Sequence, residues 1–164
     1  MVVSGAAARP GAEQMLRERA IKLSEPPTPL GAYVETIESG KLLFLSGVLP
    51  VVGGKAAFTG QLGAELTVEQ GRQAARVAAL NALALVREHL GSLDRVGRMI
   101  RLGVSIATVP RYAEHAKVAD GASELFADIF GDAGLPVRVV LGVVSLPLDT
   151  PIELDVLFEV AENQ

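Results

Sequence analysis

The chain has 164 residues, of which 49% are hydrophobic and 21% charged, and its formal net charge is −4. This length predicts one domain that is large enough to bury a core. The negative net charge disfavours nucleic acid as a partner, and the absence of cysteine excludes disulfides, a thiolate nucleophile and a cysteine-ligated metal. With only two histidines, His89 and His115, we expect no metal site.

The N-terminal residues are small and featureless, and we expect residues 1–19 to be a loose extension before a single domain over residues 20–164. Apolar positions within residues 13–23 also fit a short helix. No positive segment precedes the first apolar residues, which disfavours a secretory signal. Charges or glycines interrupt every apolar stretch within about a dozen residues, too few to span a bilayer. We therefore expect no membrane contact and a cytoplasmic protein.

Residues 24–31 contain three prolines, which remove backbone donors and predict an extended loop that leads to Tyr33. Residues 33–37 and 41–46 flank the short segment Glu38-Ser-Gly40 and predict a β-hairpin. Residues 48–63 are punctuated by glycine, with a small strand expected around residues 56–59.

The strongest helix signal covers residues 68–90. Thr67 and Gln70 have the spacing of a capping box, and Gly91 is a suitable stop. The face opposite the polar side chains is rich in alanine, which predicts a close approach of this helix to a sheet. A second helix is predicted over residues 114–130, ending at Gly131.

Three further strands are predicted near residues 100–108, 137–144 and 152–160. The resulting order of elements favours an α+β fold with two layers, in which a mainly antiparallel sheet carries two helices on one face. A doubly wound parallel sheet is the alternative. It is disfavoured because neither glycine-rich phosphate motif occurs, so no nucleotide cofactor is expected either. Val140, Val144 and Leu157 are expected to point to the second face, which would then be buried against other subunits.

Arg138 lies near the start of an otherwise uncharged strand-like run. A guanidinium in such a place needs a partner, and its planar donors suit a carboxylate held by two hydrogen bonds. One interpretation is an internal ion pair with Glu153 or Asp155. The other is that the partner is a substrate.

Four segments together resemble the YjgF/RidA family, also known as UK-type or endoribonuclease L-PSP proteins. They are Leu30-Gly-Ala-Tyr33, residues 43–50 with Ser46-Gly47 at their centre, Pro136-Val-Arg138, and residues 145–153 ending in Glu153. The resemblance covers about residues 20–160 and is that of a divergent branch.

The resemblance implies a chorismate-mutase-like fold that assembles as a homotrimer with clefts between subunits. In the archetypal branch these clefts hydrolyse reactive enamine or imine intermediates of the 2-aminoacrylate type to 2-oxo acids and ammonia. Arg138 would then hold the carboxylate of a small metabolite, and Glu153 would position or activate water. Tyr33, Ser46, Gly47 and Val140 would line the pocket. No cofactor and no metal are implied.

Three positions depart from the archetypal pattern: Val140 replaces a cysteine, Leu135 replaces an aromatic residue, and Asp120 stands where an asparagine is often found. Spacing adds a constraint, because a hairpin of the last two predicted strands would separate Arg138 from Glu153 by roughly 16 Å. A shared site would then need a subunit interface or another order of strands.

Two functions therefore stand side by side. The first is a hydrolase that deaminates enamines or imines. The second is a protein of the same fold that binds a small carboxylate without turnover, as a binding or regulatory protein. Ribonuclease activity is disfavoured by the acidic charge balance and by the lack of a paired histidine or lysine base.

Overall fold

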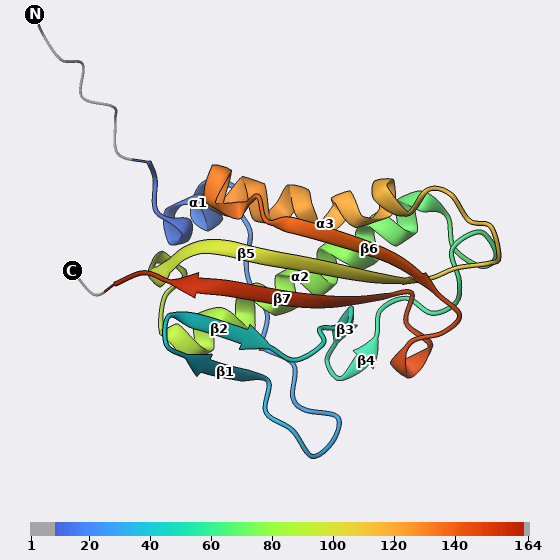
Figure 1. Ribbon diagram of the computed structural model, residues 1–164, viewed down its shortest axis with the longest axis horizontal. Helices are drawn as coiled ribbons and strands as arrows, with labels where there is room; N and C mark the ends of the chain where they lie inside the picture. The colour runs from blue at the N-terminus through green and yellow to red at the C-terminus, as the bar shows by residue number, and fades with distance from the viewer. Residues whose placement is uncertain (1–8, 163–164) are drawn as a thin grey trace, which may run out of the picture.

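A computed structural model describes residues 9–162 and contains one five-stranded sheet with two long helices (Figure 1). The strands stand in the order β1-β2-β7-β5-β6, and β3 and β4 form a separate small ribbon. The elements are α1 (Ala12–Glu18), β1 (Thr36–Ser39), β2 (Leu42–Leu45), β3 (Val51–Val52), β4 (Lys55–Ala56), α2 (Val68–Leu90), β5 (Val96–Ala107), α3 (His115–Phe130), β6 (Val137–Val143) and β7 (Ile152–Val160). The predicted α+β fold with a mainly antiparallel sheet is confirmed.

The strand order differs from sequence expectation at one place. β7 pairs antiparallel with both β2 and β5, whereas β6 pairs parallel with β5. A hairpin of the last two strands is therefore wrong, since β5 separates β6 from β7. The physical reason is that α3 connects β5 to β6 as a crossover, and a parallel pair requires such a connection.

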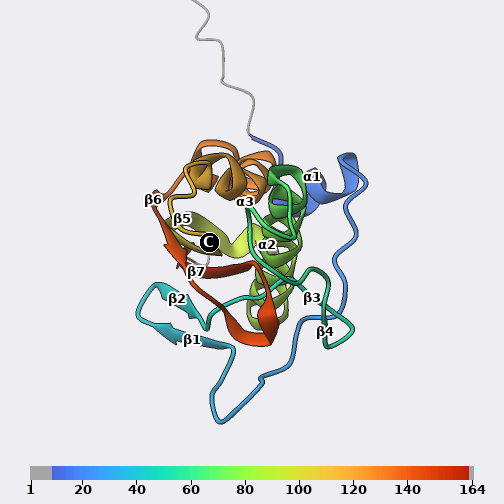
Figure 2. The ribbon, with the colours of Figure 1, turned by 90° about the vertical axis from the view of Figure 1, so that its right-hand side faces the viewer.

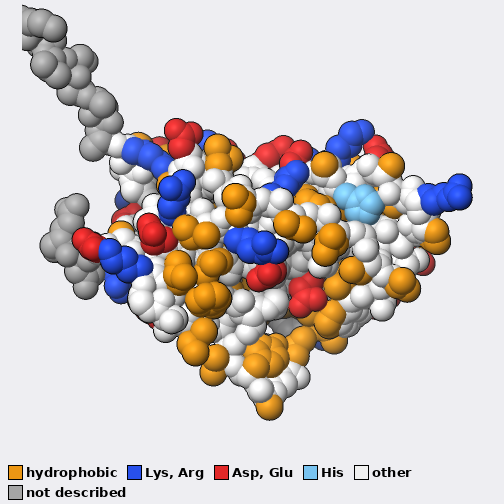
Figure 3. Space-filling view, viewed as in Figure 1, with side chains coloured by type: hydrophobic (Ala, Val, Ile, Leu, Met, Phe, Trp, Pro, Cys, Tyr) orange, Lys and Arg blue, Asp and Glu red, His pale blue; other side chains and the backbone are white. Residues whose placement is uncertain are grey.

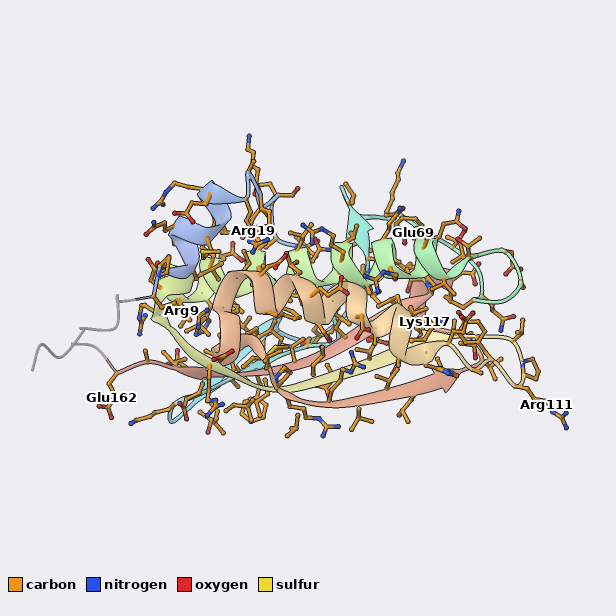
Figure 4. All side chains as sticks on the ribbon, turned by 90° about the horizontal axis from the view of Figure 1, so that it is seen from above. Arg9, Arg19, Glu69, Arg111, Lys117 and Glu162 are labelled. Carbon is orange, nitrogen blue, oxygen red and sulfur yellow. The ribbon has the colours of Figure 1, made fainter. Side chains whose placement is uncertain are left out.

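Both long helices cover the same face of the sheet, so the molecule has two layers (Figure 2). Seen from above, the helices lie on one side of the sheet, and side chains project from its other side, which no helix or strand of residues 9–162 covers (Figure 4). We call this uncovered side the open face. The expectation of two helices on one face is confirmed.

The helix α2 has the bounds that its sequence predicts. The Thr67 side chain accepts a hydrogen bond from the backbone of Gln70, and the Gln70 side chain accepts from the backbone of Thr67. Gly91 ends the helix at a φ of 81°, a left-handed conformation that favours glycine. Seven of the buried residues of α2 are small, which lets the helix lie close to the sheet: Gly71, Ala74, Ala75, Ala78, Ala79, Ala82 and Ala84.

The helices α2 and α3 also lie close to each other. A Cβ added at Gly121 of α3 would overlap with the backbone carbonyl of Arg72 in α2. The atoms nearest to a Cβ at Gly71 belong instead to side chains, those of Leu62 and Val118, at 2.7 and 3.0 Å. Backbone cannot move aside as a side-chain tip can, so the α2–α3 contact depends on glycine at position 121.

The strand β7 shows why the sheet has one buried face. Its residues alternate between the core and the open face, and Phe158 is fully buried between the rings of Phe126 and Phe130, both at 6.1 Å. Glu153, Asp155, Leu157 and Glu159 take the other positions, on the open face.

The open face carries apolar side chains around charged ones (Figure 3). Arg101 and Asp155 form an ion pair of 3.8 Å at its middle. Exposed apolar residues from three strands flank this pair: Ile37, Phe44, Val137, Val139 and Leu141. An apolar second face was expected, but Val140 is not part of it. Val140 pairs in register with Val104 and faces the helices, because side chains alternate along β6.

The short helix α1 corrects the expected domain boundary. Ala12 and Leu16 are 7% and 2% exposed and belong to the core, and α1 contacts α3. Residues 12–18 are therefore packed and are not a loose extension, because the apolar side of α1 packs against the core beside α3. Residues 1–8 of the predicted extension lie outside the described residues. Within the described part of the chain, no helix combines the length and the apolar character that crossing a membrane requires.

The α2–α3 contact leads to a test by substitution. Alanine is favoured over glycine in a helix by about 1 kcal/mol, so Gly121→Ala would stabilise an uncrowded helix. Because its Cβ would overlap with backbone, we expect Gly121→Ala instead to lower the free energy of unfolding by about 2 kcal/mol or more. Gly71→Ala, the matched control, should change it by about 1 kcal/mol or less. Urea unfolding followed by circular dichroism measures both, and an equal effect of the two substitutions would contradict the close backbone approach.

Candidate functional site

Arg138 lies on the edge strand β6 and points toward the helix layer. Its register partner on β5 is Leu102, which is fully buried. The Nη1 atom donates to Asp120 Oδ1 at 2.7 Å and to Ser123 Oγ at 2.9 Å, both on α3. An internal ion pair therefore exists, but its partner is Asp120 and not Glu153 or Asp155, because the crossover places α3 beside β6.

The same arginine keeps three of its five N–H donors free. Its side chain is 26% exposed, and Nη1 makes both of the contacts to α3. Among the described residues, Nε and Nη2 have no protein partner, and neither is a buried orphan atom. These two atoms form the fork that holds a carboxylate through two parallel hydrogen bonds. Asp120 and Ser123 thus orient a guanidinium whose Nε–Nη2 edge is open.

Val140, the second predicted residue of this strand, is half-buried and packs against the core. It lies on the same side of β6 as Arg138, two residues along. We call Arg138, Val140, Asp120 and Ser123 the arginine group.

Glu153 lies at the start of β7 on the open face, in register with Ser105. Its carboxylate is placed directly over the backbone of Gly47, and a Cβ at position 47 would overlap with Oε1. Gly47 therefore has a steric role, since only glycine leaves room for this carboxylate. Burial raises the pKa of the Glu153 carboxyl above its ordinary value, and the nearby charge of Asp155 raises it further.

Tyr33 and Ser46 hold the proline-rich loop against the sheet. The Tyr33 hydroxyl accepts a hydrogen bond from the Leu30 backbone at 2.9 Å. The Ser46 hydroxyl donates to the Val34 carbonyl at 2.6 Å, and the Ser46 backbone donates to the Glu35 carbonyl at 2.9 Å. We call Tyr33, Ser46, Gly47 and Glu153 the glutamate group.

A pocket of about 260 Å³ adjoins the glutamate group, with Tyr33 and Gly47 in its wall. Helix α2 closes the other side of this pocket, mainly with apolar side chains. Asn81 is the polar exception. It is 7% exposed, and its amide nitrogen donates to the carbonyls of Leu49 and Val51, both at 2.9 Å. Asn81 is therefore the polar side chain that α2 contributes to the pocket wall, and two hydrogen bonds fix its amide.

Sequence reasoning missed Asn81 and also Glu35, which lines the same pocket and whose pKa burial raises. The signal for Asn81 was available, because it is the single amide within the apolar face of α2. No pattern in the sequence marks Glu35.

A second hollow of about 470 Å³ opens at the end of β6. His115 and Thr108 lie beside Gly142, where a Cβ would be 2.5 Å from His115 Nε2. The rings of Tyr112 and His115 meet edge to face at 5.2 Å. Arg111 lies at the tip of this end of the molecule and points away from it (Figure 4).

The arginine group and the glutamate group do not meet within one chain. Arg138 stands level with Val156, two strands away on β7, and Glu153 is three residues further along. Their Cα atoms are therefore about 14 Å apart at ordinary strand spacing and rise. The two side chains also leave opposite faces of the sheet. Over residues 9–162, no three acidic or histidine side chains gather in a way that could hold a metal ion.

Comparison with known proteins gives a family and a fold. The family model described as YjgF/chorismate mutase-like, putative endoribonuclease matches residues 13–161. Protein TCP17 of Trypanosoma cruzi is 40% identical over 145 residues, which are 88% of this chain and 91% of that protein. The crystal structure of a putative endoribonuclease from Shewanella oneidensis has a TM-score of 0.87 at 34% identity, covering 92% of this chain and 99% of that one. The structure of E. coli TdcF with bound serine shares the fold, with a TM-score of 0.62 at 23% identity over 82% of this chain and 93% of that one.

The effect of Asp155 on Glu153 can be measured. Asp155→Asn removes a like charge, so we expect the pKa of Glu153 to fall while burial still keeps it above its ordinary value. A pH titration of labelled glutamate carboxyls by NMR measures this shift. Glu159→Gln, on the same face of β7 but six residues away, is the matched control and should leave the Glu153 pKa unchanged. An unchanged Glu153 pKa in Asp155→Asn would show that the two carboxylates do not interact.

Proposed function

Because this chain belongs to the YjgF/chorismate mutase-like family, we propose that it is a cytoplasmic hydrolase of reactive imines and enamines that carry a carboxylate. The substrates are small intermediates of the 2-aminoacrylate type, and the products are 2-oxo acids and ammonia. The observation that carries the proposal is the arginine of β6, whose Nε–Nη2 fork is open while Nη1 is locked by α3.

The reaction needs few catalytic parts. Water adds to the electrophilic imine carbon, the C=N bond breaks, a C=O bond forms, and the nitrogen leaves as ammonium. An enamine first takes a proton at carbon to become the imine. Since the imine carbon is already electrophilic, orientation of the substrate and one positioned water supply most of the catalysis. Val140 in place of a thiol is compatible with this chemistry, because no step requires a covalent intermediate.

Arg138 fixes the substrate through its carboxylate. Two parallel hydrogen bonds from Nε and Nη2 define both the position and the plane of that carboxylate. Because Asp120 and Ser123 hold Nη1, the guanidinium is oriented before the substrate arrives. This preorganisation reduces the entropy that binding must overcome.

Glu153 accepts a proton from the attacking water. A carboxyl in a partly buried place has a pKa closer to neutrality, which makes the carboxylate a stronger base than one in water. Gly47 leaves the room that keeps this carboxylate against the backbone. Tyr33 and Ser46 support the loop beside it and contribute to the pocket wall.

We propose that the cleft forms between copies of this chain in a homotrimer. Within one chain the two groups are about 14 Å apart on opposite faces, which is too far for a small substrate. The open face supports assembly, because it exposes apolar side chains from β1, β2 and β6 around the Arg101–Asp155 pair (Figure 3). The arginine group of one copy would then face the glutamate group of its neighbour.

The serine bound to E. coli TdcF supports a small ligand with a carboxylate. It equally fits a binding protein of this fold that performs no turnover. The two functions differ in one measurement, the release of 2-oxo acid, and the binding function is favoured if ligand binds to wild type and to Glu153→Gln while neither shows turnover.

Activity is tested in a coupled assay in which an amino acid dehydratase generates the imine. We expect the wild-type protein to accelerate the release of 2-oxo acid, and Arg138→Ala and Glu153→Gln each to lower this acceleration by about 100-fold or more. Arg19→Ala and Glu159→Gln are the matched controls, since both are outside the two groups, and should keep full activity. A wild-type protein that gives no acceleration would rule out the hydrolase.

The intersubunit cleft has its own test. If each cleft takes Arg138 from one copy and Glu153 from another, random reassembly of equal amounts of Arg138→Ala and Glu153→Gln restores about a quarter of the clefts. We expect the mixture to regain a corresponding share of activity after joint unfolding and refolding. A mixture as inactive as its components would mean that both side chains act within one copy.

A further inference from the structure

We propose that Asp120 makes the site selective for ligands that carry a cation next to their carboxylate, and thereby helps to release the 2-oxo acid product. This inference rests on the proposed function of Arg138 as the carboxylate clamp. It concerns a residue of α3 that the resemblance gives no role and that departs from the pattern of the archetypal branch.

The two carboxylate oxygens of Asp120 are placed differently. Its Oδ1 accepts from Arg138 Nη1 at 2.7 Å, so the carboxylate orients the guanidinium. The Asp120 side chain is 42% exposed, and its Oδ2 has no hydrogen-bond partner among the described residues. Oδ2 is therefore free to meet a ligand that Arg138 has bound.

Arg138 and the neighbouring Arg72 both have acidic partners before a ligand arrives. Asp120 neutralises Arg138, and the neighbouring Arg72 is paired with Glu124 at 2.6 Å. A simple carboxylate would bring an uncompensated negative charge close to Asp120. A zwitterion instead has two charges. Its carboxylate binds Arg138, and the cationic nitrogen on the neighbouring carbon lies toward Asp120. Two unit charges a few ångströms apart, such as the ligand cation and the Asp120 carboxylate, attract each other appreciably near a protein surface.

Substrate and product differ in this property. A protonated imine with a carboxylate has no net charge, whereas the 2-oxo acid that remains after ammonium departs has a charge of minus one. The negative charge of Asp120 therefore favours the substrate and disfavours the product. Hydrolysis itself removes the cation that Asp120 recognises.

The test compares L-serine, which is a zwitterion, with pyruvate, which is a 2-oxo acid. Isothermal titration calorimetry measures the dissociation constant of each for the full-length protein. We expect wild type to bind serine at least about tenfold more tightly than pyruvate. In Asp120→Asn the ratio of the pyruvate dissociation constant to the serine dissociation constant should fall to about one or below one. Pyruvate should also become a stronger inhibitor of turnover.

Two further variants keep the result interpretable. Asp128→Asn is the matched control, because this aspartate lies on the same helix and pairs with Arg19 at 3.2 Å, and its ratio should equal that of wild type. Asp120→Ser removes the charge by a different side chain, and it should show the same loss of selectivity as Asp120→Asn.

The outcomes separate this inference from the function on which it rests. Serine and pyruvate ratios in Asp120→Asn and Asp120→Ser that equal the wild-type ratio overturn the role of Asp120 but leave the clamp intact. Binding of both ligands to Arg138→Ala as tightly as to wild type overturns the clamp, and with it this inference. Wild type that binds neither ligand overturns both as well.

Discussion

The crossover of α3 between β5 and β6 is the constraint on which the arrangement of this protein depends. It makes β6 a parallel neighbour of β5 and leaves it at the edge of the sheet. It also places one turn of α3 beside Arg138, so that Asp120 and Ser123 reach the guanidinium. A guanidinium among apolar strands would be costly without such partners. The connection therefore both stabilises the arginine and orients it.

The two faces of the sheet differ in what packs against them. Small residues on α2 and Gly121 on α3 bring the helices close to the covered face, where the core around Phe158 is built. The other face exposes apolar side chains and the Arg101–Asp155 pair, and no helix or strand of the described residues covers it. Arg138 and Glu153 leave opposite sides of one sheet, so the proposed site shared between copies would use this face as part of the subunit interface.

Charge placement links stability to chemistry at Glu153. A carboxyl whose pKa is raised in the folded state costs stability while it is ionised, and this cost disappears as the pH falls below its unfolded pKa. Gly47 and the supported loop maintain the carboxylate in this unfavourable place. Such a cost is typical of groups that are held ready for proton transfer. At Arg138 the balance is the opposite, because Asp120 compensates the charge before a ligand binds.

The sequence by itself determined both long helices and the strands of the main sheet, because they depend on local physics: the capping box of Thr67 and Gln70 marks the start of α2, and alternation marks β7 over its full length. The small strand expected over residues 56–59 was placed wrongly, since the ribbon is formed by β3 and β4 within residues 51–56. The sequence also identified Arg138 as the single charge of its strand, whereas Glu153, one of three acidic residues on β7, was marked by the family resemblance alone. Only the tertiary structure decided the partner of Arg138, the burial of Asn81 in a pocket wall and the side of Val140. These depend on which strands are neighbours, and strand order is set by a crossover between segments far apart in the chain, which local patterns do not encode.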